Sequence, residues 1–373
     1  MITSWLTRSR GIVFAIVVPI GAVVLSLITT AGILLIVGSD PIEAYGNMFD
    51  AAFSSPYAIS GTLEKSVPRL LPALGIAIAI RAGLWNIGAE GQIYLGAIAA
   101  TGVTIWFPGL GALGIILAIL AAIFAGGLWG AIPGVLKAKK GINEVITSLM
   151  LVYIAVLLAS YLISGPWSTP GATFPATDPV PSGERLPIIW SNTLLNAGFL
   201  IAVAGIGLAW LIVSRTTLGL RLRAIGGNIK ASSMAGISVG RTIVIAMVIS
   251  GAFSGITGAI EILGVRGRLI EGFSPGYGFE AIAIALLGGL NPLGIAAVSL
   301  LFGALDAGAA GLQTTGGDVP SSIVQVTEAL AVMYVMIALG ARTILIRRHR
   351  AREALAERLE APAGEPEPGE GST

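Results

Sequence analysis

The side chains in this sequence that could do chemistry are of kinds that bind rather than react. The chain has no cysteine and a single histidine, His349. Cysteine nucleophiles and thiolate metal sites are therefore excluded, and no metal centre or acid–base pair can be assembled around one histidine. We expect no catalytic residue and no metal site. What remains are amides, carboxylates and arginines within apolar sequence, where such groups are costly and become candidates for function.

The first group of candidates is the segment 84–92 (LWNIGAEGQ), which interrupts apolar sequence with Asn86, Glu90 and Gln92 and is rich in glycine. We interpret it as a break between two helices, whose free backbone groups must be satisfied by protein or by a water-filled cavity. Arg81, nine residues before Glu90, could pair with that carboxylate across the turn. Two interpretations stay open: a structural hairpin with an ion pair, or a polar stretch along a translocation path.

The segment 286–294 (LLGGLNPLG) predicts a second break, because Pro292 lacks a backbone donor and the glycines allow the chain to turn. Gly288, Gly289 and Asn291 are its candidate residues. Broken helices in transporters often lie near the substrate path, and a plain short cytoplasmic turn explains the pattern equally well.

A third candidate lies in the segment 214–241, which contains five basic residues and no acidic one. Its centre, residues 223–237 (RAIGGNIKASSMAGI), predicts a short helix with Asn228 as N-cap and Gly236 as C-terminal stop. A connection between two spans needs only a few residues, so a long loop with a capped helix favours a cytoplasmic partner. The tendency of cytoplasmic loops to carry positive charge would by itself explain the arginines.

Composition places these candidates in a membrane. Only 11% of the 373 residues are charged, against roughly 25% in soluble proteins. With 55% apolar residues and a mean hydropathy of +0.88, most of the surface must face lipid. The formal net charge of +2 gives no reason to expect a nucleic-acid partner.

The apolar runs predict an all-α, polytopic membrane protein with ten transmembrane helices. They cover residues 11–38, 66–84, 90–107, 111–136, 144–164, 193–213, 242–264, 279–290, 295–312 and 321–344. Segments placed inside hold 15 Lys and Arg, whereas segments placed outside hold four, so both termini are predicted to be cytoplasmic. Arg266 and Arg268 contradict this rule, because they fall on the outer side next to the short eighth span.

The segments between and after the spans complete the predicted organisation. Residues 1–344 form one transmembrane domain, with the loop 214–241 inside and the loop 165–192 outside. That outer loop is too rich in Pro, Gly, Ser and Thr for a regular helix and could meet an extracytoplasmic partner. Residues 345–373 predict a disordered cytoplasmic tail. The ionisable residues that remain at membrane depth are interpreted as lying near span ends: Arg69, Glu261, Glu280, Asp306 and Glu328.

Two glycine series predict flat helix faces that neighbouring helices can approach closely. One comprises Gly126, Gly130 and Gly134, and the other comprises Gly251 and Gly255. We interpret both as packing surfaces of the bundle.

Four stretches together resemble the permease subunit of bacterial ATP-binding cassette (ABC) importers of the branched-chain amino acid, simple sugar and nucleoside group. They are LWNIGAEGQIYLGA (84–97), GINEVITSLMLVYIA (141–155), RAIGGNIKASSMAGI (223–237) and LLGGLNPLG (286–294). The first two stretches look most like the larger of two permeases in nucleoside importers that use a basic-membrane-type lipoprotein. No phosphate-binding GxxxxGK[ST] loop occurs in the chain.

The resemblance implies a fold of the cobalamin-importer type in the bacterial cytoplasmic membrane. It implies three partners: a separate ABC ATPase that binds ATP and Mg²⁺, a second permease that makes a heterodimer, and an extracytoplasmic substrate-binding lipoprotein. The chain itself would need no cofactor. The resemblance also implies that the helix around 228–236 couples to the ATPase. The residues implied for this contact are Arg223, Gly227, Asn228, Ala235 and Gly236. A simple-sugar permease remains an alternative, as does an ion-driven transporter that uses Glu261, Glu280 or Asp306.

Overall fold

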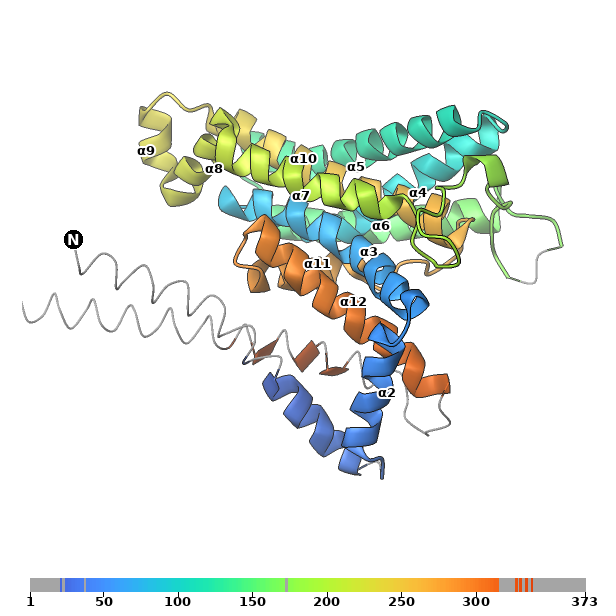
Figure 1. Ribbon diagram of the computed structural model, residues 1–373. Helices are drawn as coiled ribbons and strands as arrows, with labels where there is room; N and C mark the ends of the chain where they lie inside the picture. Colours follow the sequence, from blue (N-terminus) through green and yellow to red (C-terminus); the bar gives the residue numbers. More distant parts are fainter. Residues whose placement is uncertain are drawn as a thin grey trace, which may run out of the picture. The chain divides into compact units, whose positions relative to one another are not determined.

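The computed structural model describes residues 24–36, 38–171 and 174–314, together with residue 21 and a few positions between 326 and 337. Within these residues all regular structure is helical, apart from two isolated bridges, which confirms the all-α prediction for this part (Figure 1). Most of the predicted spans 11–38 and 321–344, and the whole tail 345–373, lie outside the described residues. The ten-span count and the cytoplasmic termini stay predictions.

The chain divides into two compact units, residues 30–328 and residues 1–29 with 329–373. Of the second unit only a few positions are described, among them Thr29 and Tyr334, whose hydroxyls lie 2.8 Å apart. The labelled helices belong to the larger unit. They are α2 (Pro41–Phe53), α3 (Pro56–Arg81), α4 (Ala89–Trp106), α5 (Ala112–Lys140), α6 (Glu144–Ser164), η1 (Ser182–Glu184), α7 (Gly198–Arg215), α8 (Thr217–Gly227), α9 (Ile229–Met234), α10 (Val239–Ile260), the π-helix η2 (Glu261–Arg266), α11 (Tyr277–Leu287) and α12 (Pro292–Thr314).

Residues 39–65, which lie between the first two predicted spans, are largely helical. Asp40 accepts a hydrogen bond from the backbone of Ile42 and caps α2, which begins with Pro41. Ser55 caps α3 in the same way, and Pro56 is its first residue, ten residues before the predicted start of that span. A side-chain cap followed by proline is a strong helix start signal. The hydropathy pattern did not indicate this helix start, because the first part of α3 carries charged residues.

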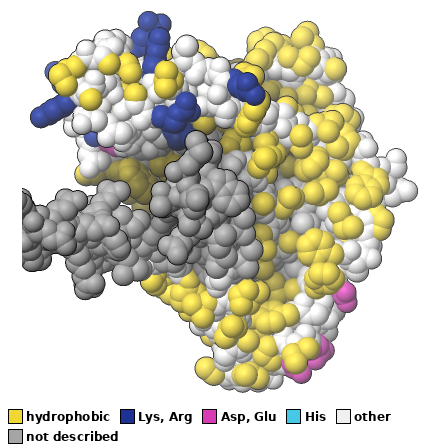
Figure 2. All heavy atoms as spheres, turned by 60° about the vertical axis from the view of Figure 1, so that its left-hand side comes forward, with side chains coloured by type: hydrophobic (Ala, Val, Ile, Leu, Met, Phe, Trp, Pro, Cys, Tyr) yellow, Lys and Arg dark blue, Asp and Glu magenta, His cyan; other side chains and the backbone are white. Residues whose placement is uncertain are grey.

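Helices α3, α4 and α10 are the most buried, whereas α5, α6 and α7 expose many large apolar side chains. Five segments are long and apolar enough to cross a bilayer: Ala112–Lys140, Glu144–Ser164, Gly198–Arg215, Val239–Arg266 and Pro292–Ala309. Figure 2 shows apolar side chains over much of one face, with Lys and Arg gathered at the top of the view. Such a surface is suited to lipid rather than water.

The two glycine series meet each other, which confirms the packing interpretation. A Cβ atom on Gly126 would overlap the backbone of Gly251 and Gly255, and one on Gly255 would overlap the carbonyl of Ala122. Gly96 of α4 approaches Gly255 just as closely. The backbones of α4, α5 and α10 therefore touch directly, as in other membrane bundles with small residues at the helix interface.

The described part of the outer loop 165–192 contains no regular helix longer than η1, as predicted. Its backbone is hydrogen-bonded to η2 and to the residues that follow it. Thr177 N donates to Leu269 O at 3.0 Å, Val180 N to Gly267 O at 2.7 Å and Leu186 N to Leu263 O at 2.9 Å. Arg266 is also accounted for here, because it pairs with Glu261 and donates to Phe273 O.

Candidate functional site

The break predicted at 84–92 exists between α3 and α4, and a closed set of hydrogen bonds holds it. Asn86 Nδ2 donates to Gln92 Oε1 at 2.9 Å and to Ser250 Oγ of α10 at 2.8 Å. Gln92 Nε2 and the backbone N–H of Gly88 donate to Asn86 Oδ1. Asn86, Gln92 and Ser250 are all buried. The amides thus satisfy each other and the turn, which is what buried polar groups in a membrane protein require.

The predicted ion pair between Arg81 and Glu90 is wrong. Arg81 Nη2 donates instead to the carbonyl of Leu290 at 2.7 Å. Glu90 Oε2 accepts from the backbone N–H of Gly278, at the start of α11, at 2.7 Å. Each side chain therefore joins its own helix end to a segment remote in sequence, and not to the other side of the turn.

The second predicted break, at 288–291, also exists and separates α11 from α12. Gly289 and Leu290 both have left-handed backbone conformations, with φ of 62° and 59°. Gly288 packs against the backbone of Gly294 and Ile295, so a larger residue would not fit there. Asn291 caps α12, because its side chain accepts from Leu293 N at 3.1 Å. Since Arg81 binds Leu290, this break is tied to the end of α3.

The segment 214–241 contains two helices where the sequence predicted one. The expected helix is α9, with Asn228 as its N-cap accepting from Ala231 N at 3.0 Å and Gly236 beyond its end at a φ of 78°. The missed helix is α8, which Thr216 caps. Arg223 of α8 donates to the carbonyl of Val213, so it serves the helix junction rather than the surface. Gly227 has no neighbouring atoms that a Cβ would meet, and Ala235 is exposed.

The contacts of these two helices differ in kind. In α8, Leu222 and Ile225 are buried, and Gly226 lies directly against the carbonyl of Arg81 at the end of α3. In α9, Met234 is 84% exposed and Ile229 is 54% exposed. Exposed apolar side chains on a short helix within a basic segment make a surface suited to a protein partner.

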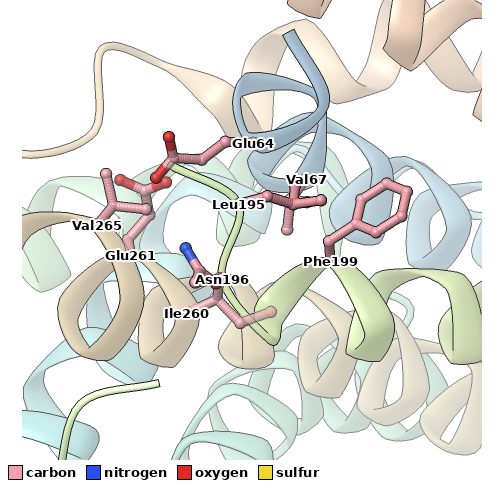
Figure 3. A pocket seen from close by; sticks show the side chains of 8 residues that line it. All are labelled: Glu64, Val67, Leu195, Asn196, Phe199, Ile260, Glu261 and Val265. Carbon is pink, nitrogen blue, oxygen red and sulfur yellow. The ribbon is translucent and has the colours of Figure 1, made fainter. Parts of the chain in front are cut away.

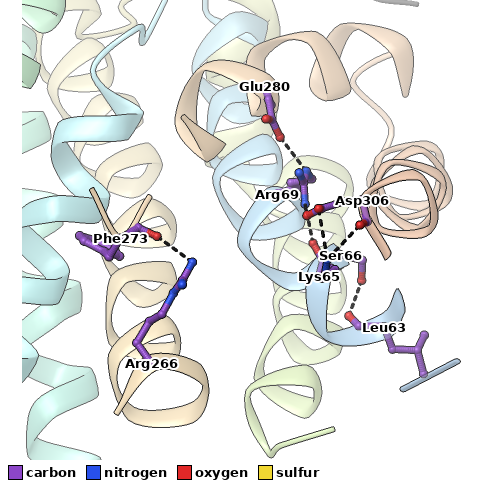
Figure 4. A network of polar contacts seen from close by, with 8 residues as sticks. All are labelled: Leu63, Lys65, Ser66, Arg69, Arg266, Phe273, Glu280 and Asp306. Atoms are coloured by element: carbon purple, nitrogen blue, oxygen red, sulfur yellow. Dashed lines mark hydrogen bonds and ion pairs between the residues drawn. The ribbon is translucent and has the colours of Figure 1, made fainter. Parts of the chain in front are cut away.

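Arg69, Glu280 and Asp306, which the sequence placed near separate span ends, come together with Lys65 between α3, α11 and α12 (Figure 4). We call Lys65, Arg69, Glu280 and Asp306 the α3 charge cluster. Arg69 Nε lies 2.6 Å from Glu280 Oε2, and its Nη1 lies 3.0 Å from Asp306 Oδ2. Lys65 Nζ lies 3.2 Å from Asp306 Oδ1. Two cations and two carboxylates balance each other within the cluster.

The position of the cluster makes it a candidate part of a polar path. Arg69 is near the middle of α3 and only 3% exposed, with its guanidinium 5.1 Å from the Tyr277 ring. Glu280 and Asp306 are 25% and 30% exposed. Charged groups are excluded from the lipid core, so the exposed parts of these carboxylates are suited to protein or water. The signal available in the sequence was Lys65 and Arg69 at i and i+4, which lie on one helix face.

A comparison with families of known proteins agrees with the sequence resemblance. The family described as the branched-chain amino acid transport system permease component matches residues 58–340. The chain belongs to this permease family. It is therefore a multi-pass protein of the plasma membrane, and its family supplies the translocation subunits of ABC transporters.

Curated relatives of this permease match over most of its length. It is 36% identical to a glucose ABC transporter permease of Haloferax volcanii, over 84% of this chain and 85% of that one. It is 35% identical to a guanosine ABC transporter permease of Bacillus subtilis, over 88% and 95%. It is 33% identical to a nucleoside ABC transporter permease of Lactococcus lactis, over 86% and 91%. No solved structure matches the permease significantly.

Proposed function

We propose that this permease forms half of the translocation pathway of an ABC importer for nucleosides. The observation that carries the proposal is the match to guanosine and nucleoside permeases over 86–88% of the chain. The chain would act without covalent chemistry, and ATP with Mg²⁺ would bind to a separate ATPase. A simple sugar is the second candidate substrate, because the glucose permease of Haloferax volcanii matches equally well.

The fold supports a route by which an ATPase could act on this pathway. The exposed face of α9 is the proposed docking surface, and α9 is joined directly to α8 at Asn228. Gly226 of α8 touches the carbonyl of Arg81, and the Arg81 side chain binds Leu290 at the second break. Movement of the docking helices would thus reach both α3 and the α11–α12 turn. Helix α3 in turn carries the charge cluster, so the contacts are continuous from docking surface to proposed path.

The residues proposed for the path divide into two kinds. Asn86 and Gln92 are buried and hydrogen-bonded to each other, so their role is to fix the first break. Glu90, Gly288, Gly289 and Asn291 hold helix ends in the same way. The part that polar solutes could reach is the exposed edge of the α3 charge cluster, where Glu280 and Asp306 can accept hydrogen bonds from hydroxyl groups.

The proposed partners predict what accompanies the permease from its native membrane. Purification of the tagged chain in mild detergent, followed by mass spectrometry, should recover an ABC ATPase, a second permease and a substrate-binding lipoprotein. Proteoliposomes containing that complex should then take up labelled guanosine when ATP is inside. Uptake of glucose but not guanosine would reassign the substrate to sugars. Isolation of the chain alone, with uptake driven by an ion gradient, would overturn the importer proposal.

Substitution of Met234 tests the docking surface. Met234→Asp should reduce ATP-driven uptake at least about tenfold, because a charge replaces an apolar contact in the centre of the proposed interface. Thermal unfolding of the permease should not change, since the side chain touches little of its own chain. Met234→Leu is the matched control and should retain uptake. If Met234→Asp transports normally and still recovers the ATPase, α9 is not the docking element.

A further inference from the structure

Two hollows in the larger unit differ in what they can hold. The first lies between Glu64 and Glu261 (Figure 3); it leaves no space for a water molecule, and Glu261 faces Arg266. The second has a volume of about 420 Å³, within the roughly 300–1,000 Å³ of small-molecule sites. It lies between α8, the α9–α10 connection and the first turns of α10, and we call it the basic pocket. Among its lining residues are Arg221, Ile237, Ser238, Arg241, Thr242 and Ile245.

The two arginines of the basic pocket come from different helices, and their charge is not balanced. Arg221 belongs to α8 and Arg241 to the first turn of α10. Neither forms an ion pair within the described part of the chain, and the sequence from α8 to Arg241 contains no acidic residue. The exposed Lys139 adds positive charge at the neighbouring end of α5, since α10 packs on α5 at Gly240 and Ala138. A pocket with this excess of positive charge favours an anion.

The start of α10 supplies further donors to the basic pocket. Ser238 precedes the helix, and its hydroxyl makes no capping hydrogen bond. The first hydrogen bond along the helix runs from Thr242 N to Ser238 O at 3.1 Å, so the N–H groups of the preceding turn are open to a ligand. Such N–H groups interact favourably with phosphate oxygens. Guanidinium, hydroxyl and N–H groups together can satisfy a phosphate, which accepts several hydrogen bonds.

The basic pocket extends from the end of a span into its first turns. Arg241 lies near the start of the segment Val239–Arg266, which is long and apolar enough to cross a bilayer, and Ile245 lies about one turn further in. Ile237 and Ile245 give the pocket apolar lining beside its arginines. On α8, Leu220 is 61% exposed. A soluble protein reaches only the outer part of such a pocket, whereas a phospholipid has a charged phosphate at the membrane surface and apolar chains below it.

We propose that the basic pocket binds an anionic phospholipid, with the phosphate group of the lipid held by Arg221, Arg241 and the hydroxyl of Ser238. Arginine suits this contact because its planar guanidinium group can donate two parallel hydrogen bonds to phosphate oxygens. Ile237 and Ile245 would contact the apolar part of the same molecule. The bound lipid would join α8 to α10 next to α9. The proposal goes beyond the transport function and depends neither on the solute nor on docking at α9.

The test uses the purified transporter complex in mild detergent after bound lipid has been removed. Phosphatidylglycerol, phosphatidylcholine with the same acyl chains, and inorganic phosphate are added separately at equal ionic strength. Native mass spectrometry counts bound lipid, and thermal unfolding is followed in parallel. We expect saturable binding of phosphatidylglycerol and a rise of about 3–5 °C in the unfolding temperature, with neither effect from the other two. A complex with Arg221→Gln and Arg241→Gln together should bind one phosphatidylglycerol fewer per copy of this chain and lose the rise.

The matched control is Arg215→Gln, which removes an arginine of the same segment that lies over the Trp210 ring and does not line the pocket. This variant should bind phosphatidylglycerol like the unchanged chain. Should the double variant fail to assemble, Arg241→Gln alone decides the outcome by the same count. Equal binding of phosphatidylcholine, equal stabilisation by inorganic phosphate, or full binding in the double variant would each overturn the proposal. Loss of the ATPase from the double variant, with its bound lipid unchanged, would assign the two arginines to a protein interface instead.

Discussion

Arg69→Met is expected to remove most folded permease from the membrane and to abolish uptake. The substitution keeps the length of the side chain but leaves Glu280 and Asp306 without the guanidinium that lies 2.6 and 3.0 Å from them. Removing one member of a buried ion pair costs about 3–5 kcal/mol, which is an upper bound here because Glu280 is 25% exposed and Asp306 keeps Lys65 as a partner. The measurements are the amount of monodisperse protein after extraction, its unfolding temperature, and ATP-driven uptake.

Two further substitutions show whether burial causes this effect. Lys65→Met removes a partner of Asp306 that is 36% exposed, so it should change stability far less than Arg69→Met. Arg69→Lys keeps the charge but cannot reach both carboxylates with separate nitrogens, so its stability should lie between the other two. An Arg69→Met permease that unfolds at the normal temperature would show that the cluster does not hold α3, α11 and α12 together.

Features that depend on neighbouring residues were predictable from the sequence. Asn228 caps α9 because its side chain reaches a backbone N–H three residues later, and Gly236 follows because a left-handed backbone favours glycine. The break at 288–291 follows from a proline and two glycines in the same way. In each case the interaction that fixes the structure lies within a few positions, so the pattern of residue types contains the necessary information.

Features that depend on distant partners were not predictable. Arg69 and Glu280 are 211 residues apart in sequence, and each alone resembles an ordinary charge near a span end. Arg81 and Glu90 are close in sequence, which suggested a pair, yet their partners are Leu290 and Gly278. Pairing across a helical bundle is set by which helix faces meet. One sequence shows the faces of each helix but not their neighbours.

The start of α3 shows how this limits span prediction. Glu64 and Lys65 lowered the hydropathy of its first part, and the predicted span began at residue 66 instead of 56. Hydropathy assumes that a span faces lipid. Helix α3 is buried by other helices along much of its length, and its charges pair with them, so the assumption fails for this helix. Helices α5, α6 and α7 expose apolar side chains and match their predicted spans closely.

Gly255→Val is expected to prevent assembly of the bundle altogether. A Cβ atom at this position would overlap the carbonyl of Ala122 in α5, and Gly96 of α4 approaches the same residue from another helix. Overlap with backbone cannot be relieved by rotating a side chain, so whole helices would have to separate. We expect a cost of at least about 3 kcal/mol, the upper end for overpacked sites. The measurements are the yield of monodisperse protein and its unfolding temperature.

Gly207→Val in α7 is the matched control, because a Cβ there meets no atom within 4 Å and the residue is exposed. Both substitutions add the same apolar, β-branched side chain to a membrane helix, so helix propensity and hydropathy change equally. Only the distance to the neighbouring helix differs. If Gly207→Val folds almost normally while Gly255→Val gives little monodisperse protein, the loss of folded protein is due to contact between helices. Equal behaviour of the two variants would mean that α4, α5 and α10 do not approach each other at these glycines.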